Sequence, residues 1–164
     1  MRYFITLISE YSNPQRFSRE QARIKAERYC AYQERSQHEV RSKLYEWGQY
    51  SRDAEEIISE LIQGNFLNEE RFAQAYAQGK FRIKGWGKIR IKQGLKLKKV
   101  PEPMILKVLK SIDPDDYREK LRSLLDKKSL TVHEKDPYKK RSILLRYAAS
   151  KGYEQDIITD MLAQ

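Results

Sequence analysis

A pattern of apolar residues at helical spacing returns about every 50 residues along this chain, and it restricts the fold more than any other feature. Leu44, Leu95 and Ala148 occupy similar places in successive segments. Each is followed by a turn and then by an apolar pair: Ile57 and Ile58, Ile105 and Leu106, Ile157 and Ile158. A fixed period of this size is typical of proteins built from stacked supersecondary units. We therefore predict an all-α fold, a tandem array of three three-helix, helix-turn-helix-like repeats, elongated and curved.

Capping residues mark the helices of the first predicted repeat, residues 18–64. Ser18 is the expected N-cap of its first helix, because a serine hydroxyl accepts a hydrogen bond from the free amides of a helix start. Ser36 and Glu39 have the spacing of a capping box, and Ser51 is expected to cap the third helix. Glycine is common just after a helix, so the predicted helix stops are Gly48 and Gly64.

The same signals return in a second predicted repeat, residues 65–112. Asn68 is expected to cap its first helix, and the sequence Gly85-Trp86-Gly87 to break that helix. Pro101 and Pro103 suit the first turn of its last helix, where a missing amide hydrogen costs nothing.

A third predicted repeat spans residues 113–164, and it begins with Asp113 and Pro114 as helix cap and first helical residue. The polar stretch 126–135 predicts a long loop after this helix. Asp136 and Pro137 predict the next helix start, and Gly152 its end. Residues 1–17 precede the repeats as an N-terminal extension.

Composition supports a folded helical protein of the cytoplasm. The 164 residues include only seven Gly and five Pro. Cys30 is the single cysteine, which fits a reducing compartment, and we expect it to be a small buried side chain. No apolar run approaches the roughly 18 residues that a transmembrane helix requires, so we expect no membrane partner. The apolar start, residues 1–8, is too short for a signal peptide; a short strand, a frayed extension and a contact arm all fit it.

Positive charge is concentrated in the second repeat. The chain has a net charge of +10, and the window from residue 80 to residue 110 alone holds eleven bases and one acid, Glu102. Those bases are Lys80, Arg82, Lys84, Lys88, Arg90, Lys92, Lys96, Lys98, Lys99, Lys107 and Lys110. The first repeat, by contrast, has eight bases and nine acids. Such clustering favours a polyanionic partner over a merely solvated surface.

Within this window, lysines at 84, 88, 92, 96 and 99 follow one another at helical steps of four, four, four and three. These steps place the last four on one helix face, with Ile91 and Leu95 beside them and directed to the core. Tyr76, Phe81 and Trp86 lie nearby in sequence and offer rings for stacking. A second candidate basic patch consists of Lys139, Lys140 and Arg141. Nucleic acid phosphate is the usual partner of such surfaces; an acidic protein surface, or both together in a filament, fits equally well.

The residues of common catalytic and metal sites do not form their usual patterns. His38 and His133 have no Cys or His neighbour at the spacing of metal ligands. There is no Gly-rich phosphate loop and no nucleophile elbow. Adjacent carboxylates such as Glu55 and Glu56 fall in first helical turns, where they stabilise the positive end of the helix dipole. We expect a protein that is not an enzyme and that uses no cofactor or metal.

Several motifs resemble those of the RecX family of recombinase regulators. They are the stretch Gly64-Asn65-Phe66-Leu67-Asn68-Glu69-Glu70-Arg71-Phe72-Ala73, the corner Gly85-Trp86-Gly87 with Arg90-Ile91, and the ending Lys98-Lys99-Val100. The segments Arg35–Val40 and Lys43–Gly48 in the first repeat also fit. The resemblance covers residues 22–162, with two departures: Lys99 stands where the family usually has glycine, and Asn65 is an additional residue before Phe66.

The resemblance implies a function as well as a fold. RecX-like proteins have three tandem three-helix units, bind in the groove of the RecA recombinase filament, restrain its ATP hydrolysis and strand exchange, and also bind single- and double-stranded DNA. For this chain it implies two partners, the RecA filament and DNA, and we take a monomer as the default. We assign the binding surface to a set of basic residues of the second repeat and to the second patch: Lys80, Arg82, Lys84, Lys88, Arg90, Lys92, Lys96, Lys98, Lys99, Lys139, Lys140 and Arg141. A stand-alone helix-turn-helix-like DNA-binding protein and a scaffold for acidic proteins stay open as alternatives.

Overall fold

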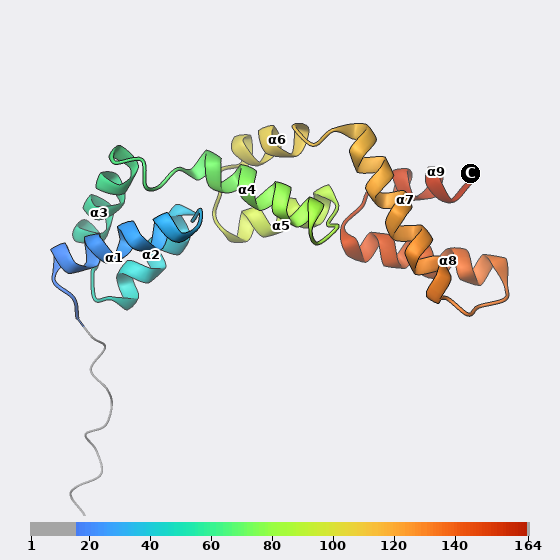
Figure 1. The fold of residues 1–164 in the computed structure, drawn as a ribbon, viewed down its shortest axis with the longest axis horizontal. Helices are drawn as coiled ribbons and strands as arrows, with labels where there is room; N and C mark the ends of the chain where they lie inside the picture. The colour runs from blue at the N-terminus through green and yellow to red at the C-terminus, as the bar shows by residue number, and fades with distance from the viewer. Residues whose placement is uncertain (1–15, 164) are drawn as a thin grey trace, which may run out of the picture. The chain divides into compact units, whose positions relative to one another are not determined.

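The computed structural model describes residues 16–163, and in this part of the chain every regular element is an α-helix. The described residues form nine helices, which confirms the predicted all-α class (Figure 1). They divide into two compact units, the first ending at Glu69 and the second beginning at Glu70. The expectation for residues 1–8 lies outside the described residues, and the boundaries of the three repeats stay a prediction.

The first unit is a three-helix bundle. Its helices are α1 (Arg19–Tyr32), α2 (Gln37–Glu46) and α3 (Ser51–Gln63), and each packs against the other two. Their apolar faces meet in one core, and Cys30 lies in it as a buried side chain, as expected. The fully buried residues of this core include Ala22, Ala26, Val40, Leu44, Ala54 and Ile57.

The predicted caps of α1 and α2 are confirmed, and that of α3 is wrong. Ser18 accepts a hydrogen bond from the backbone of Gln21, and Ser36 accepts one from Glu39, each within a complete capping box. Ser51 instead is the first residue of α3 and has a left-handed φ of +45°. An N-cap needs an extended backbone, so Ser51 cannot take that role.

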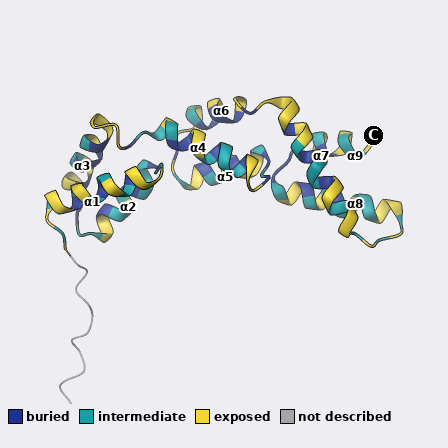
Figure 2. Ribbon diagram, in the orientation of Figure 1, coloured by how far each residue is buried: buried dark blue, intermediate teal, exposed yellow. Residues whose placement is uncertain are grey.

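The second unit has six helices around one continuous core. They are α4 (Glu69–Arg82), α5 (Lys88–Leu97), α6 (Glu102–Lys110), α7 (Pro114–Thr131), α8 (Pro137–Lys151) and α9 (Gln155–Ala163). Buried residues from all six helices belong to the same cluster, which runs from Phe72 through Leu121 to Ile158 (Figure 2). The second and third predicted repeats therefore share a core.

Helix α7 is longer than predicted. The expected loop, residues 126–135, is helical as far as Thr131, and only the short segment before Pro137 is irregular. The added helical turn places Lys128 over the ring of Tyr147 on α8, with its ammonium 5.4 Å from the ring centroid. Packing along α8 and good helix-forming residues together outweigh the absence of an apolar stripe in this stretch.

Candidate nucleic-acid interface

Helix α5 has its lysines next to a fully buried apolar stripe. Ile91 and Leu95 have no exposed surface and lie in the core, as predicted. Lys88, Lys92 and Lys96 follow at steps of four on the adjoining face, where the first two are half-buried and Lys96 is exposed. The apolar stripe thus fixes the rotation of α5 and, with it, the direction in which these three lysines project.

Glu102, the one acid of the basic window, binds two of these lysines. It is the first residue of α6, and its carboxylate lies 2.7 Å from the ammonium of Lys92 and 3.3 Å from that of Lys96. The hydrogen bond from Lys92, supported by Lys96, holds the pKa of Glu102 below its usual range, so this carboxylate is charged at neutral pH. The lysine face of α5 is therefore partly neutralised within the protein.

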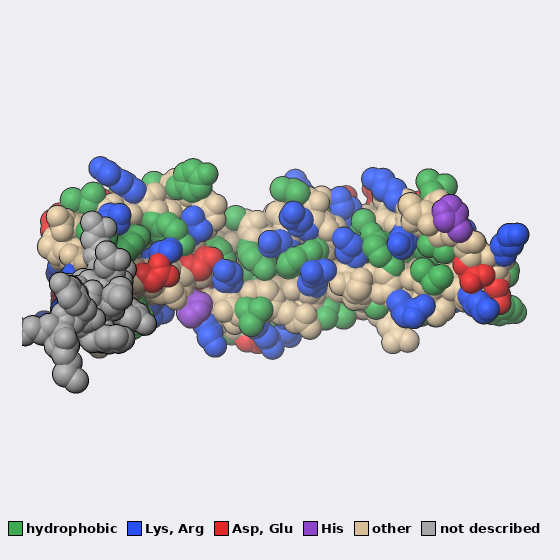
Figure 3. Space-filling model, turned by 90° about the horizontal axis from the view of Figure 1, so that it is seen from below, with side chains coloured by type: hydrophobic (Ala, Val, Ile, Leu, Met, Phe, Trp, Pro, Cys, Tyr) green, Lys and Arg blue, Asp and Glu red, His purple; other side chains and the backbone are tan. Residues whose placement is uncertain are grey.

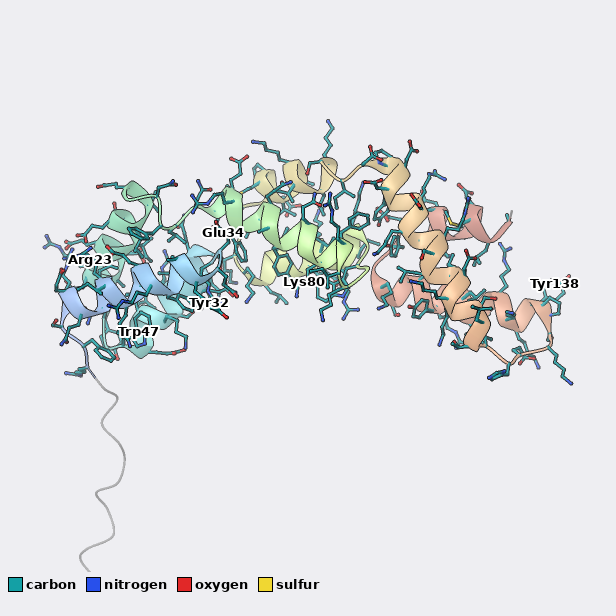
Figure 4. The ribbon with its side chains drawn as sticks, viewed as in Figure 1. Arg23, Tyr32, Glu34, Trp47, Lys80 and Tyr138 are labelled. Carbon is teal, nitrogen blue, oxygen red and sulfur yellow. The ribbon has the colours of Figure 1, made fainter. Side chains whose placement is uncertain are left out.

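Trp86 lies between two of the predicted binding residues. The ammonium of Lys80 is 4.8 Å from the centroid of the Trp86 ring, and the guanidinium of Arg90 is 4.3 Å from it. The ammonium of Lys80, which is labelled in Figure 4, also lies 5.2 Å from the centroid of the Tyr76 ring. Arg90 donates a hydrogen bond to the carbonyl of Ser150 at 3.2 Å. Cation–π contacts of this kind orient a cation without cancelling its charge.

The start of α5 is anchored to the third predicted repeat through its backbone. The amide of Gly87 donates to the carbonyl of Lys151 at 2.8 Å, and that of Ile89 to Gly152 at 3.0 Å. The amide of Lys88 donates to the Tyr117 hydroxyl at 2.8 Å. These amides are already bonded within the protein, so phosphate contacts on this surface fall to side chains rather than to the helix N-terminus.

Tyr117 was not identified from the sequence, yet it connects three elements. Its hydroxyl accepts from α5 and donates to the carboxylate of Glu154 at 2.6 Å, and its ring lies 4.9 Å from that of Tyr153. Burial, followed by the hydrogen bond to Glu154, raises the pKa of Tyr117 far above its ordinary value, so the hydroxyl stays protonated. Only its spacing within an apolar stripe was visible in sequence.

The remaining predicted residues of the window lie at the two ends of α5. Arg82 and Lys84 are exposed on the α4–α5 side. At the other end, Lys98 is half-buried and Lys99 is exposed. Lys99 has a left-handed φ of +60°, the conformation that glycine adopts most easily. The turn therefore has the backbone that a glycine would give, although the residue is a lysine.

The second candidate patch is split by the structure. Lys139 is exposed and Lys140 is half-buried near the start of α8. Arg141 donates a hydrogen bond at 2.6 Å to the carbonyl of Leu162 and so satisfies the C-terminal end of α9. Lys120, which no sequence pattern distinguished, donates in a similar way to the carbonyl of Arg82 at 2.7 Å.

Five basic residues of the first unit form ion pairs with carboxylates. The pairs are Arg19 with Glu56 and Glu60, Arg23 with Glu20 and Glu27, Arg41 with Glu55, Lys43 with Glu46, and Arg52 with Glu56. On the second unit, the middle of the face seen in Figure 3 shows many Lys and Arg side chains and few Asp or Glu. The candidate interface is therefore the surface around α5, with Lys80 and Arg90 beside it.

Residues 16–163 contain neither a cluster of metal-ligating side chains nor a helix able to span a membrane. No group of His, Cys, Asp or Glu there is arranged to hold a metal ion. No helix in this range has the length and apolar character to cross a membrane.

The fold and the lysine-rich surface of α5 place this chain among all-helical proteins built from three-helix modules in tandem. Family models match all three modules: "RecX, first three-helix domain" at residues 22–61, the second domain at 68–109 and the third at 115–162. The chain belongs to the RecX family, which is a family of regulatory proteins.

Individual relatives agree with this assignment. The chain is 30% identical over 135 residues to the regulatory protein RecX of Haemophilus influenzae (strain PittGG), covering 82% of this chain and 88% of that protein. It is 35% identical over 124 residues to that of Clostridium perfringens (strain 13 / Type A), covering 74% of this chain but 58% of the relative. The chain thus spans little more than half the length of this clostridial relative.

A solved structure shares the fold. The crystal structure of RecX from Lactobacillus salivarius superposes with a TM-score of 0.81 at 23% sequence identity, covering 88% of this chain and 94% of that chain. At this level of identity the likeness concerns the fold.

Proposed function

We propose that this chain regulates a RecA recombinase, mainly as an inhibitor. It binds in the groove of the RecA–DNA filament, restrains ATP hydrolysis and strand exchange, and has an affinity of its own for single- and double-stranded DNA. It acts as a monomer in the cytoplasm and catalyses no reaction itself. The observation that supports this proposal most is the lysine-rich surface of α5 in a protein of the RecX family.

The chemistry of that surface suits a phosphate backbone. Lysine is a compact, strongly hydrated point charge that suits phosphate contacts better than the bidentate readout of base edges. Lys88, Lys92 and Lys96 are held on one face by the buried Ile91 and Leu95. A polyanion that neutralises them releases counterions, and this release drives binding.

The alternative is a stand-alone helix-turn-helix-like DNA-binding protein. Such proteins place the first residues of a recognition helix against base edges in the major groove. The corresponding part of α5 is engaged elsewhere, because Gly87 is buried against the end of α8 and Lys88 is bonded to Tyr117 through its amide. This arrangement favours contacts to the backbone over readout of a sequence.

The decisive experiment measures ATP hydrolysis by recombinase assembled on single-stranded DNA while the chain is added. We expect inhibition at a substoichiometric ratio of chain to recombinase, because a protein seated in the groove affects many neighbouring subunits. No effect at equimolar chain contradicts the proposal. A selection from random duplexes that returned a clear consensus site would favour the alternative.

A salt titration tests the assigned surface separately. Replacing Lys88, Lys92 and Lys96 with Gln is expected to flatten the slope of log affinity against log salt by roughly two to three units, because each phosphate of duplex DNA that a lysine neutralises adds about 0.9 to that slope. Arg28 and Arg52, both exposed in the first unit, provide the control when replaced with Gln. Equal changes of slope in the two variants would place the interface elsewhere.

A further inference from the structure

Two large apolar side chains stand almost free in solvent around the turn between α7 and α8. The exposed fraction is 83% for Leu130 and 85% for Tyr138. Figure 4 shows Tyr138 at the start of α8, beside the turn. We call residues 127–140 the α7–α8 tip. Single exposed apolar residues are ordinary on protein surfaces, so this exposure needs a second feature before it indicates a site.

The second feature is charge. The tip contains two acids, Glu134 and Asp136, and five lysines, which are Lys127, Lys128, Lys135, Lys139 and Lys140. Both carboxylates accept hydrogen bonds from backbone amides: the amide of Asp136 donates to Glu134 at 3.0 Å, and the amide of Tyr138 donates to Asp136 at 2.9 Å. They hold the turn in shape, and the tip has a net positive charge around its two apolar side chains.

The tip is also well anchored. Asp136 caps α8 and Pro137 occupies its first turn, which fixes the backbone that supports the Tyr138 ring. Lys128 lies over the Tyr147 ring of α8 and joins the two helices behind the tip. A ring on a fixed backbone loses little conformational freedom when it contacts a partner. Because Asp136 already accepts from the first amides of α8, phosphates at this end of the molecule must be bound by lysines.

We propose that the α7–α8 tip is a stacking site for unpaired bases of single-stranded DNA, with the Tyr138 ring against a base and the flanking lysines on neighbouring phosphates. Exposed aromatic rings next to basic side chains bind single strands in this way, because every base offers a flat face. Bases inside a duplex are covered by their neighbours, and the ring cannot reach those faces. The inference rests on the DNA affinity in the proposed function and adds a preference for the unpaired strand.

A lipid surface is the competing partner for exposed apolar and basic side chains. Interfacial binding relies on a broad apolar helix face. The apolar faces of α7 and α8 are used within the protein, where Leu121, Leu125 and Leu144 are buried. Two isolated side chains, one of them an aromatic ring, fit a base better than they fit an acyl layer.

The test uses the full chain and fluorescence anisotropy with three probes: an oligothymidine, an abasic strand with the same number of phosphates, and a duplex of the same length. Tyr138→Ala is expected to weaken binding to oligothymidine about tenfold, in the range measured for removal of one stacking ring. Binding to the abasic strand and to the duplex stays nearly unchanged. Tyr138→Phe keeps the ring and therefore keeps the affinity. Tyr32→Ala is the matched control, because Tyr32 is 84% exposed on α1.

Several results would overturn the inference: unchanged oligothymidine binding in Tyr138→Ala, an equal weakening on the abasic strand or duplex, or Tyr138-dependent binding to phosphatidylserine vesicles in place of the oligonucleotide. Wild-type chain that binds none of the DNA probes removes the inference together with the chain's own DNA affinity. Wild-type binding that is indifferent to Tyr138→Ala removes this inference alone and leaves the filament proposal intact.

Discussion

At the scale of single residues, Glu102 occupies the place where a phosphate would meet the α5 lysines. It binds Lys92 and Lys96 together, at 2.7 and 3.3 Å. Exposed ion pairs of this kind are weak, so a phosphate can displace the carboxylate at low cost. We therefore expect Glu102 to lower the affinity of the α5 surface for a polyanion without preventing binding.

Replacing Glu102 with Gln should raise the affinity for DNA by up to about fivefold at low salt. In the variant, Lys92 and Lys96 have no ion pair with Glu102 that must break before they bind a phosphate. Anisotropy measured across a salt series checks this, and the gain should shrink as salt rises. Glu70→Gln is the matched control. Glu70 forms an ion pair of 2.5 Å with Lys107 on α6, and neither residue belongs to the assigned binding surface. Equal gains in both variants would point to overall charge rather than to this surface.

Lys99 stores backbone strain at the end of α5. A side chain in the left-handed region crowds the backbone, whereas glycine avoids this at some cost in unfolded-state entropy. With φ at +60°, Lys99→Gly should raise the free energy of unfolding by about 0.5–1 kcal/mol in urea denaturation. Lys98→Gly removes the same charge at the preceding residue, where φ is −83°, and should not raise the free energy of unfolding. A stabilisation shared by both variants would assign the effect to charge.

Sequence alone predicts the lysines of the candidate site but not their partners. Steps of four along α5 are visible in the chain, and so is the buried pair Ile91 and Leu95 beside them. The contact of Glu102 with Lys92 arises from the packing of α6 on α5, and the turn that makes it contains the left-handed Lys99. Local spacing cannot supply a contact that depends on how two helices pack.

At the scale of elements, the docking of α5 on the end of α8 is close enough to exclude a methyl group. A Cβ added at Gly87 would lie 2.2 Å from the carbonyl oxygen of Gly152 and 2.5 Å from the amide nitrogen of Tyr153. These atoms belong to the backbone and cannot rotate away. The Gly85-Trp86-Gly87 corner, which the sequence suggested as a helix break, is thus also a packing contact.

Gly87→Ala should lower the free energy of unfolding by about 2–3 kcal/mol, because the two backbones must separate to admit the methyl group. Chemical denaturation of the full chain measures it. Gly79→Ala is the matched control: it lies inside α4 with no atom within 4 Å of the added Cβ, so helix propensity should stabilise the chain by about 0.5–1 kcal/mol. A neutral result at Gly87 would mean that this junction is looser than the structure shows.

The sequence predicts a helix boundary correctly where the side chain of a capping residue determines it. Ser18 and Ser36 set their helix starts through their own side chains, and both were predicted. The start of α3 is fixed instead by the turn before it, where buried Gln49 donates to the carbonyl of Phe17 at 2.6 Å. The extension of α7 likewise depends on packing against α8. Both errors occur where contacts distant in sequence determine the backbone.

At the scale of the whole molecule, charge is handled differently in the two units. Five basic residues of the first unit are bound by nearby carboxylates, as Arg19 is by Glu60 and Arg41 by Glu55. The second unit contains the window with eleven bases and one acid. The two units therefore differ in the surface that they offer to a polyanion, and we expect the second unit to direct association.

Lysine acetylation followed by mass spectrometry tests this division on the intact chain. In the presence of oligonucleotide we expect labelling of Lys84, Lys88 and Lys96 to fall several-fold, because phosphates cover their ammonium groups. Lys25 and Lys43 of the first unit provide the internal control: the first lies over the Phe17 ring and the second is bonded to Glu46, and neither should change. Protection of the first-unit lysines instead would mean that DNA meets the neutral surface, and that the concentration of charge around α5 serves the recombinase.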